Sequence, residues 1–419
     1  MYYFLFIIYL SCILYFIPRI GFMKNAGLQS GTIRILFIIK IFVGLLWGVV
    51  NSKLANGNSD ILAFNVWGWQ EYQVLVNDPK TFFTNLFYAG YPSYNNFFGS
   101  VGSFWNDLES NIIAKFLALF NILSRGNYYI NSLFFNFFCF FGHVALYKIF
   151  VNIYKTKKSA IVIGCFLMPS TLLFTSGIGK DNVIFTLFGL FSYCIYFSLQ
   201  KKYTVKRILI ALLCFAGILL IRNYVALVLI PALLAMVLAY KLTISPVKIF
   251  AGVYLLVLLL LAGLSFSTSI NPAGVIAQKQ KDFLAIPAAR TQIPMDTLLP
   301  NTGSLIKNLP QALNHGFVRP YIWESKNVSD FLLALELLFY ILLFVFFVAT
   351  VKQTSPPPAP FILFGLAIGI SVWLLNGFIV PNINSLVRYR SIFLPFLITP
   401  LLCFVVNEGN IKYISFKNI

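Results

Sequence analysis

Runs of about 20 consecutive apolar residues recur along this chain, and they limit its fold more than any other feature. A helix of that length crosses about 30 Å of hydrocarbon, and the runs lack the alternation that is typical of membrane β-barrel strands. The residues are 59% hydrophobic and only 10% charged, whereas a soluble domain has about 25% charged residues. The sequence therefore predicts an all-α polytopic membrane helical bundle. About eleven spans are expected, near residues 2–17, 33–50, 130–153, 159–176, 182–199, 206–221, 223–240, 247–266, 331–351, 359–380 and 389–406.

The apolar runs divide the chain into five parts. Residues 1–50 contain spans one and two, residues 130–266 contain spans three to eight, and residues 331–419 contain the last three spans with a short tail. Two long loops, at residues 51–129 and 267–330, separate these parts. The first loop is expected to hold two amphipathic helices that lie along the membrane.

Basic residues predict the orientation of the bundle. Lysine and arginine gather on alternate connections, and by the positive-inside rule these connections face the cytoplasm. The N-terminus is then outside and the C-terminus is cytoplasmic. The formal net charge of +19 is mainly a topology signal on this interpretation, and no nucleic-acid partner is expected. Both long loops, which carry most of the acidic residues, face outward. The chain is expected in the cytoplasmic (inner) membrane of a bacterium.

Five charged residues on short outer connections suggest a binding site. Lys180 and Asp181 lie in a very short turn, GKDN, while Arg222 begins the seventh run, and Arg388 and Arg390 begin the last one. Cations on outer connections are what the positive-inside rule disfavours, so their position at helix ends predicts an outward-facing anion site. Each residue also has a plainer explanation: a solvated turn in which Asp181 caps the next helix, or an anchor to lipid phosphate.

The first long loop carries a second candidate surface, in the segment NSDILAFNVWGWQEYQ. Asp60, Phe64, Trp67 and Glu71 are spaced four, three and four apart, which places them on one face of a helix. Carboxylates beside aromatic rings form a common sugar-binding arrangement. The alternative is an interfacial helix with its tryptophans at the headgroups. A second amphipathic helix is expected from Asn106 onward.

These features together resemble the multi-span glycosyltransferases of the GT-C fold, which use lipid-linked sugars. In that fold, the first long external loop holds two juxtamembrane helices, and a carboxylate at the start of the first helix acts as, or positions, the catalytic base. The segments PSTLLFTSGIGKD and RYRSIFLP also resemble segments of bacterial envelope proteins of this type. The resemblance implies that Asp60 is the base, with Glu71 a weaker candidate.

The same resemblance implies roles for the outer cations. Lys180, Arg222, Arg388 and Arg390 would bind the phosphate of a polyprenyl-phosphate-linked sugar, and Asp181 would orient Lys180 or contact a sugar. The first loop has no Asp-Glu or Asp-x-Asp pair, which several branches of the fold carry. No metal ligands and no cofactor are therefore assigned, and dependence on a divalent metal is left open.

The second long loop contains the segment HGFVRPYIWESKN. His315, Arg319, Tyr321 and Trp323 combine titratable and aromatic side chains, and they are candidates for the acceptor site. A histidine near proline and tryptophan in a loop is also a common structural residue.

Three functions remain open at this point. The first is a glycosyltransferase that acts on a polyprenyl-phosphate donor at the outer face of the membrane. The second is an O-antigen or exopolysaccharide polymerase, which transfers a glycan from polyprenyl pyrophosphate. The third is a transporter of lipid-linked glycans, which should have charges deep within its spans. The main deep candidates are Lys40, Lys148 and Glu336, whereas most polar groups gather at one face.

Overall fold

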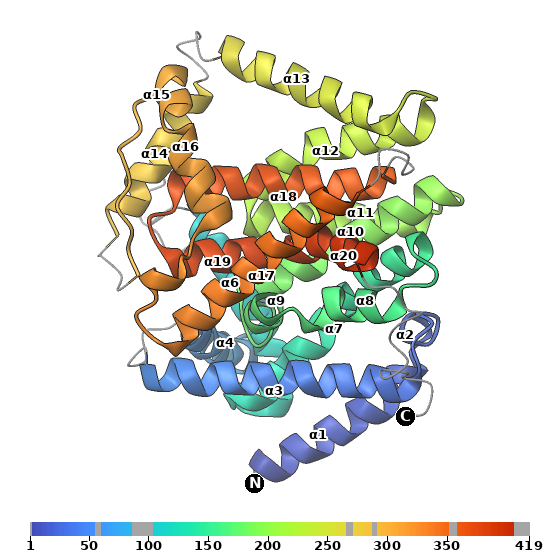
Figure 1. Ribbon diagram of the computed structural model, residues 1–419. Helices are drawn as coiled ribbons and strands as arrows, with labels where there is room; N and C mark the ends of the chain where they lie inside the picture. Colours follow the sequence, from blue (N-terminus) through green and yellow to red (C-terminus); the bar gives the residue numbers. More distant parts are fainter. Residues whose placement is uncertain are drawn as a thin grey trace.

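The computed structural model is an assembly of helices packed side by side (Figure 1). It describes residues 2–54, 60–85, 104–264, 271–286, 291–351 and 358–405. Within those ranges the regular elements are all helical, and the one isolated β-bridge joins Gln292 and Asn382. The all-α prediction is confirmed for this part of the chain.

The helices of the first half are α1 (Tyr2–Phe16), η1 (Ile17–Arg19), α2 (Gly21–Lys24), α3 (Ser30–Leu54), α4 (Asp60–Asn77), α5 (Pro79–Thr84), α6 (Phe104–Ser124), α7 (Tyr128–Ile153), α8 (Lys158–Val162), η2 (Ile163–Leu167), α9 (Pro169–Phe174) and α10 (Lys180–Gln200). Those of the second half are α11 (Val205–Ile221), α12 (Asn223–Lys241), α13 (Pro246–Leu264), α14 (Pro272–Leu284), α15 (Thr302–Lys307), α16 (Leu309–Leu313), η3 (Asn314–Val318), η4 (Ile322–Glu324), α17 (Val328–Thr350), α18 (Pro360–Ile379), α19 (Ile383–Ser391) and α20 (Leu394–Val405). In Figure 1, α1 and α13 lie along opposite edges of the bundle.

The structure supports a membrane protein but divides the predicted spans differently. Among the described residues, eight helices are long and apolar enough to cross a membrane: α1 with η1, α3, α7, α10, α12, α13, α17 and α18. The run at 206–221 corresponds to α11, which has 17 residues. The run at 159–176 is broken into α8, η2 and α9, and the last run belongs to α19 and α20, which meet at a bend of 65°. The count of eleven spans stays a prediction.

Proline accounts for both breaks. Pro169 begins α9, and Met168 before it has an extended ψ of 122°, because proline disfavours helical geometry in the preceding residue. Pro395 is the second residue of α20, directly after the bend, where its missing N–H disturbs no helical hydrogen bond. An apolar run therefore need not form one straight helix.

α7 and α10 are the most buried of the candidate spans, and they touch backbone to backbone. A Cβ added at Gly142 of α7 would lie 2.5 Å from the Cα of Thr186 in α10, and one added at Gly189 would lie 2.6 Å from the carbonyl oxygen of Gly142. Small residues permit such close approach between helices in a membrane. This contact fixes the position of α10, whose first turn carries Lys180 and Asp181.

Lys115 joins the three helices of the first long loop. Its Nζ lies 2.7 Å from Oε2 of Glu71 in α4, and it donates to the backbone oxygen of Phe82 at 2.9 Å and to Oδ1 of Asn85 at 2.8 Å. The Lys115 side chain is only 4% exposed. Glu71 therefore supplies the counter-charge of a buried lysine and ties α4 to α6. Whether these helices lie on a membrane surface stays a prediction.

Candidate functional site

The turn before α10 is held from inside the bundle. Gly177 has a φ of +86°, a left-handed conformation that glycine adopts without strain. Its amide donates to Oδ1 of Asn136 at 3.0 Å, and its carbonyl accepts from Nδ2 of Asn182 at 2.9 Å. α10 then begins at Lys180, so the side chains of Lys180 and Asp181 both extend from its first turn.

Asp181 is the centre of the site, because it accepts hydrogen bonds from two arginines. Nη2 of Arg222 donates to its Oδ1, and Nε of Arg388 donates to its Oδ2. Arg222 lies between α11 and α12, and Arg388 lies in α19. The Asp181 carboxylate is 6% exposed, the Arg222 side chain 9% and the Arg388 side chain 31%. Asp181 does not cap α10, as one sequence interpretation had it, but orients two guanidinium groups.

One hydrogen-bond donor of Arg222 has no partner among the described residues at this site. Its Nη1 donates to the hydroxyl of Tyr224 at 2.9 Å, and its guanidinium lies 4.3 Å from the ring centroid of Tyr389. Its Nε is buried and has no hydrogen-bond partner among the described residues. A buried donor without a partner carries a free-energy penalty, and it is common where a ligand completes the hydrogen bonds.

Lys180 has a different partner from its neighbour in the chain. Its Nζ forms an ion pair with Oε1 of Glu109, a residue of α6 that the sequence analysis did not select. Burial raises the pKa of the Glu109 carboxyl, while Lys180 and Arg222 act in the opposite direction. Nζ of Lys180 also lies 5.6 Å from the ring centroid of Phe64 in α4. The site therefore joins the first long loop to the bundle.

We call Lys180, Asp181, Arg222, Arg388 and Glu109 the Asp181 cluster. Lys279 of α14 adds a further positive charge close enough to influence Glu109. The five residues of the cluster are three cations and two carboxylates, which gives a net charge of 3 − 2 = +1, and the charge of Lys279 is offset by Asp282. An excess of positive charge in a partly buried site favours an anionic ligand.

Arg390 is not brought into the Asp181 cluster. Two positions along a helix turn the side chain by about 200°, so Arg388 and Arg390 point to opposite sides of α19. Nη1 of Arg390 donates to the carbonyl of Arg319 at 2.9 Å and to that of Gly316 at 3.3 Å. Its guanidinium also lies 5.7 Å from the ring centroid of Trp373. In this position it supports the second long loop.

The four residues predicted for an acceptor site form a local group of their own. Nη1 of Arg319 lies 3.2 Å from Nε2 of His315, and its Nε lies 3.2 Å from Oε1 of Glu324. Tyr321 and Trp323 stack with ring centroids 4.6 Å apart, and Trp323 is 80% exposed. Burial, helped by Arg319, lowers the pKa of His315 to about 4, so His315 is neutral near pH 7. The contact with Arg390 links this group to α19.

Asp60 and Trp67 complete the set of predicted residues on α4. Asp60 is the first residue of α4, and its side chain lies outside the part of the chain that the structure describes. Phe64 follows one helical turn later and faces Lys180, which places the start of α4 beside the Asp181 cluster. Phe64 is 3% exposed and Trp67 is 41% exposed, so the predicted stripe is partly covered.

A buried lysine lies behind the turn that carries the cluster. Nζ of Lys40 in α3 donates to the carbonyl of Thr175, lies 3.2 Å from Nε2 of His143 and donates to Oδ1 of Asn182 at 3.3 Å. The Lys40 side chain is 1% exposed. These bonds hold both ends of the turn, from Thr175 to Asn182.

No protein-family model, curated protein or solved structure matches this chain. Among the described side chains there is no group of three or more histidine, cysteine, aspartate or glutamate residues that could hold a metal ion. What the site offers chemically is oriented positive charge and nearby carboxylates.

Proposed function

We propose that this protein is a membrane glycosyltransferase that moves a sugar from a polyprenyl-phosphate donor to an acceptor at the outer face of the bacterial cytoplasmic membrane. The supporting observation is the Asp181 cluster, in which cations from separate parts of the chain meet at one end of the bundle. The unpartnered Nε of Arg222 and the net positive charge both favour a phosphate group.

The cluster suits the leaving group of this reaction. An acceptor hydroxyl attacks the anomeric carbon of the sugar, and the bond from that carbon to the phosphate oxygen breaks. The hydroxyl proton passes to a carboxylate, and polyprenyl phosphate leaves with the additional negative charge. Guanidinium groups that are already oriented stabilise this developing charge without reorganising. Asp181 holds Arg222 and Arg388 in that orientation.

Asp60 is the proposed base; it is the first residue of α4, and Phe64, one helical turn later, lies beside Lys180 of the cluster. Glu109 is a second carboxylate at the same place, and its raised pKa is suited to accepting a proton. Glu71 is a weaker candidate, since it neutralises the buried Lys115. The stacked Tyr321 and Trp323 offer an aromatic surface to an acceptor sugar.

Two other functions use the same residues differently. A polymerase that takes glycans from polyprenyl pyrophosphate needs the same cations, and it differs in its product, a ladder of lengths. A transporter of lipid-linked glycans is favoured by one observation, the buried Lys40 and its polar partners deep in the bundle.

The decisive experiment compares surface glycans from cells in which the only copy of the gene encodes the wild type, Arg388→Gln or the control Lys307→Gln. Lys307 is an exposed cation of α15 outside the cluster. Loss of one discrete sugar step in Arg388→Gln alone supports the transferase, and collapse of a ladder to its shortest member supports the polymerase. Unchanged glycans, with the protein present in the membrane, contradict both.

The purified protein gives an independent test. Reconstituted in liposomes with a polyprenyl-phosphate-linked sugar and an acceptor glycan extracted from the same cells, wild type and Lys307→Gln should transfer the sugar and release polyprenyl phosphate, whereas Arg388→Gln should do so more slowly by a factor of about 10². Movement of the intact donor across the bilayer without release would instead support the transporter.

A further inference from the structure

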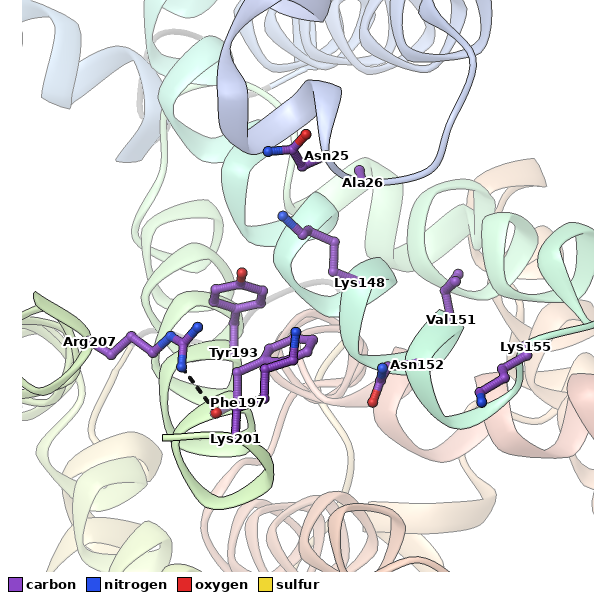
Figure 2. Close-up of a pocket in the computed structure, with 10 residues that line it drawn as sticks. All are labelled: Asn25, Ala26, Lys148, Val151, Asn152, Lys155, Tyr193, Phe197, Lys201 and Arg207. Atoms are coloured by element: carbon purple, nitrogen blue, oxygen red, sulfur yellow. Dashed lines mark hydrogen bonds between the residues drawn. The ribbon is translucent and has the colours of Figure 1, made fainter. Parts of the chain in front are cut away.

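A second basic site lies at the other end of α10. It is a cavity of about 410 Å³ lined by Asn25, Ala26, Lys148, Val151, Asn152, Lys155, Tyr193, Phe197, Lys201 and Arg207 (Figure 2). These residues come from α7, α10 and α11, from the residues that follow α7 and α10, and from the connection between α2 and α3. Asp181 lies in the first turn of α10 and Lys201 is its C-cap, so this cavity is about 30 Å from the Asp181 cluster.

The charged side chains that line the cavity are all positive among the described residues. Four of its lining residues are cations, Lys148, Lys155, Lys201 and Arg207, and no aspartate or glutamate is present among the described residues that line it. The last turn of α10 has a negative dipole end that favours nearby cations, which accounts for part of this pattern. It does not account for Lys148 and Lys155, which approach the cavity from the α7 side (Figure 2).

The side chains around the cavity are positioned by the fold. Nζ of Lys148 donates to the carbonyl of Phe22 at 3.2 Å and lies 5.2 Å from the ring centroid of Tyr193. Nη1 of Arg207 donates to the carbonyls of Phe197 and Lys202, each at 3.1 Å. Both cations are thereby held at the wall of the cavity, with further donor hydrogens available to a ligand.

We propose that this cavity binds a phosphate group, and that the group belongs to the headgroup of an anionic membrane lipid or to free phosphate. The converging cations and the concave shape fit a phosphate group from either source. The aromatic side chains of Tyr193 and Phe197 would in addition contact the apolar part of a lipid. The site lies at the basic ends of the helices, which the positive-inside rule assigns to the cytoplasmic leaflet. It is separate from the proposed transfer reaction.

The test uses a double variant, Lys155→Gln with Lys201→Gln, because both side chains are exposed and their loss leaves the helix contacts intact. Lys241→Gln with Lys248→Gln is the matched control, since it removes two exposed cations outside the cavity, one from the last turn of α12 and one from the first turn of α13. The full-length proteins are taken from nanodiscs of phosphatidylcholine with some phosphatidylglycerol, and the phosphatidylglycerol that remains bound is counted by native mass spectrometry. In a second arm, orthophosphate is titrated into the lipid-free proteins in detergent by calorimetry.

Each neutralised cation should weaken binding by about fivefold, so the cavity variant should bind about 25-fold more weakly than wild type, and the control should bind like wild type. Loss of retained phosphatidylglycerol in the cavity variant alone identifies a lipid headgroup. Loss of orthophosphate binding in that variant alone identifies free phosphate. If neither probe binds, or if the two double variants behave alike, the proposal is wrong.

Discussion

Lys180 and Asp181 are adjacent in the chain, yet each forms ion pairs with a different part of the molecule. Lys180 pairs with Glu109 of α6, and Asp181 pairs with Arg222 and with Arg388, 207 positions away. Adjacent helical residues point about 100° apart, so one turn of α10 can serve two partners. The first loop, the middle of the chain and the last helices thereby meet at one place.

The pair of Asp181 and Arg222 should contribute strongly to stability. Asp181→Asn leaves two guanidinium groups without their counter-charge, one of them deeply buried, and we expect the free energy of unfolding to fall by about 3 kcal/mol. Adding Arg222→Gln should cost less than its separate effect, with a coupling of about 1–3 kcal/mol. Thermal unfolding of the four proteins in detergent measures this cycle, and strictly additive effects would contradict the pairing.

Substitutions at Glu71 and Asp60 should distinguish a structural role from a catalytic one. Glu71→Gln removes the counter-charge of buried Lys115, so we expect a loss of about 2 kcal/mol in stability and little change in turnover of the folded fraction. Asp60→Asn should lower turnover by a factor of about 10²–10⁴ if the carboxylate is the base. Rates normalised to folded protein provide the comparison, and full activity of Asp60→Asn would remove Asp60 from the mechanism.

Glu109 should make stability depend on pH. Burial raises its pKa in the folded protein above the unfolded value, so the folded state binds the proton more tightly. Its contribution to stability is therefore largest at low pH and declines as the pH rises through the carboxyl range and up to the raised pKa. Melting temperatures recorded over this range should have a flatter profile for Glu109→Gln. Lys180→Gln should displace the wild-type decline to higher pH, because the ammonium opposes the shift.

A substitution at Gly142 tests the contact between α7 and α10. Gly142→Ala places a methyl group 2.5 Å from the Cα of Thr186, and we expect the free energy of unfolding to fall by about 1–3 kcal/mol. Gly252→Ala in α13 is the control, since a Cβ there meets nothing within 4 Å, and alanine should be neutral or stabilise by up to about 1 kcal/mol. Equal unfolding temperatures for the two variants would argue against the close contact.

The sequence predicted the helical fold well because apolar run length is a direct consequence of membrane thickness. It singled out Lys180, Arg222 and Arg388 because the positive-inside rule makes cations on predicted outer connections conspicuous. Arg390 could have been excluded from the same group, since a spacing of two in a helix separates the side chains. Glu109 could not have been chosen, because its partner depends on how α6 lies against α10, and its own segment shows only an acid near a helix start.

The breaks at Pro169 and Pro395 show a similar limit. Both prolines are visible in the sequence, but a proline within an apolar run is compatible with a straight span, a kink or two helices. Which of these occurs depends on neighbours that satisfy the freed backbone groups. At Pro169 the neighbour is Glu336, whose carboxylate accepts from the amide of Ser170 at 3.0 Å.

The backbone contact of Gly142 and Gly189 fixes the position of α10 along α7. α10 cannot slide along α7 without a clash, and its length of 21 residues keeps its two charged ends about 30 Å apart. Charged groups resist entry into hydrocarbon, and a rigid helix cannot shorten or lengthen to suit its surroundings. A bilayer of a different thickness must then deform around the protein or tilt it, and lipid chain length becomes a physical variable that acts on both ends of α10 at once.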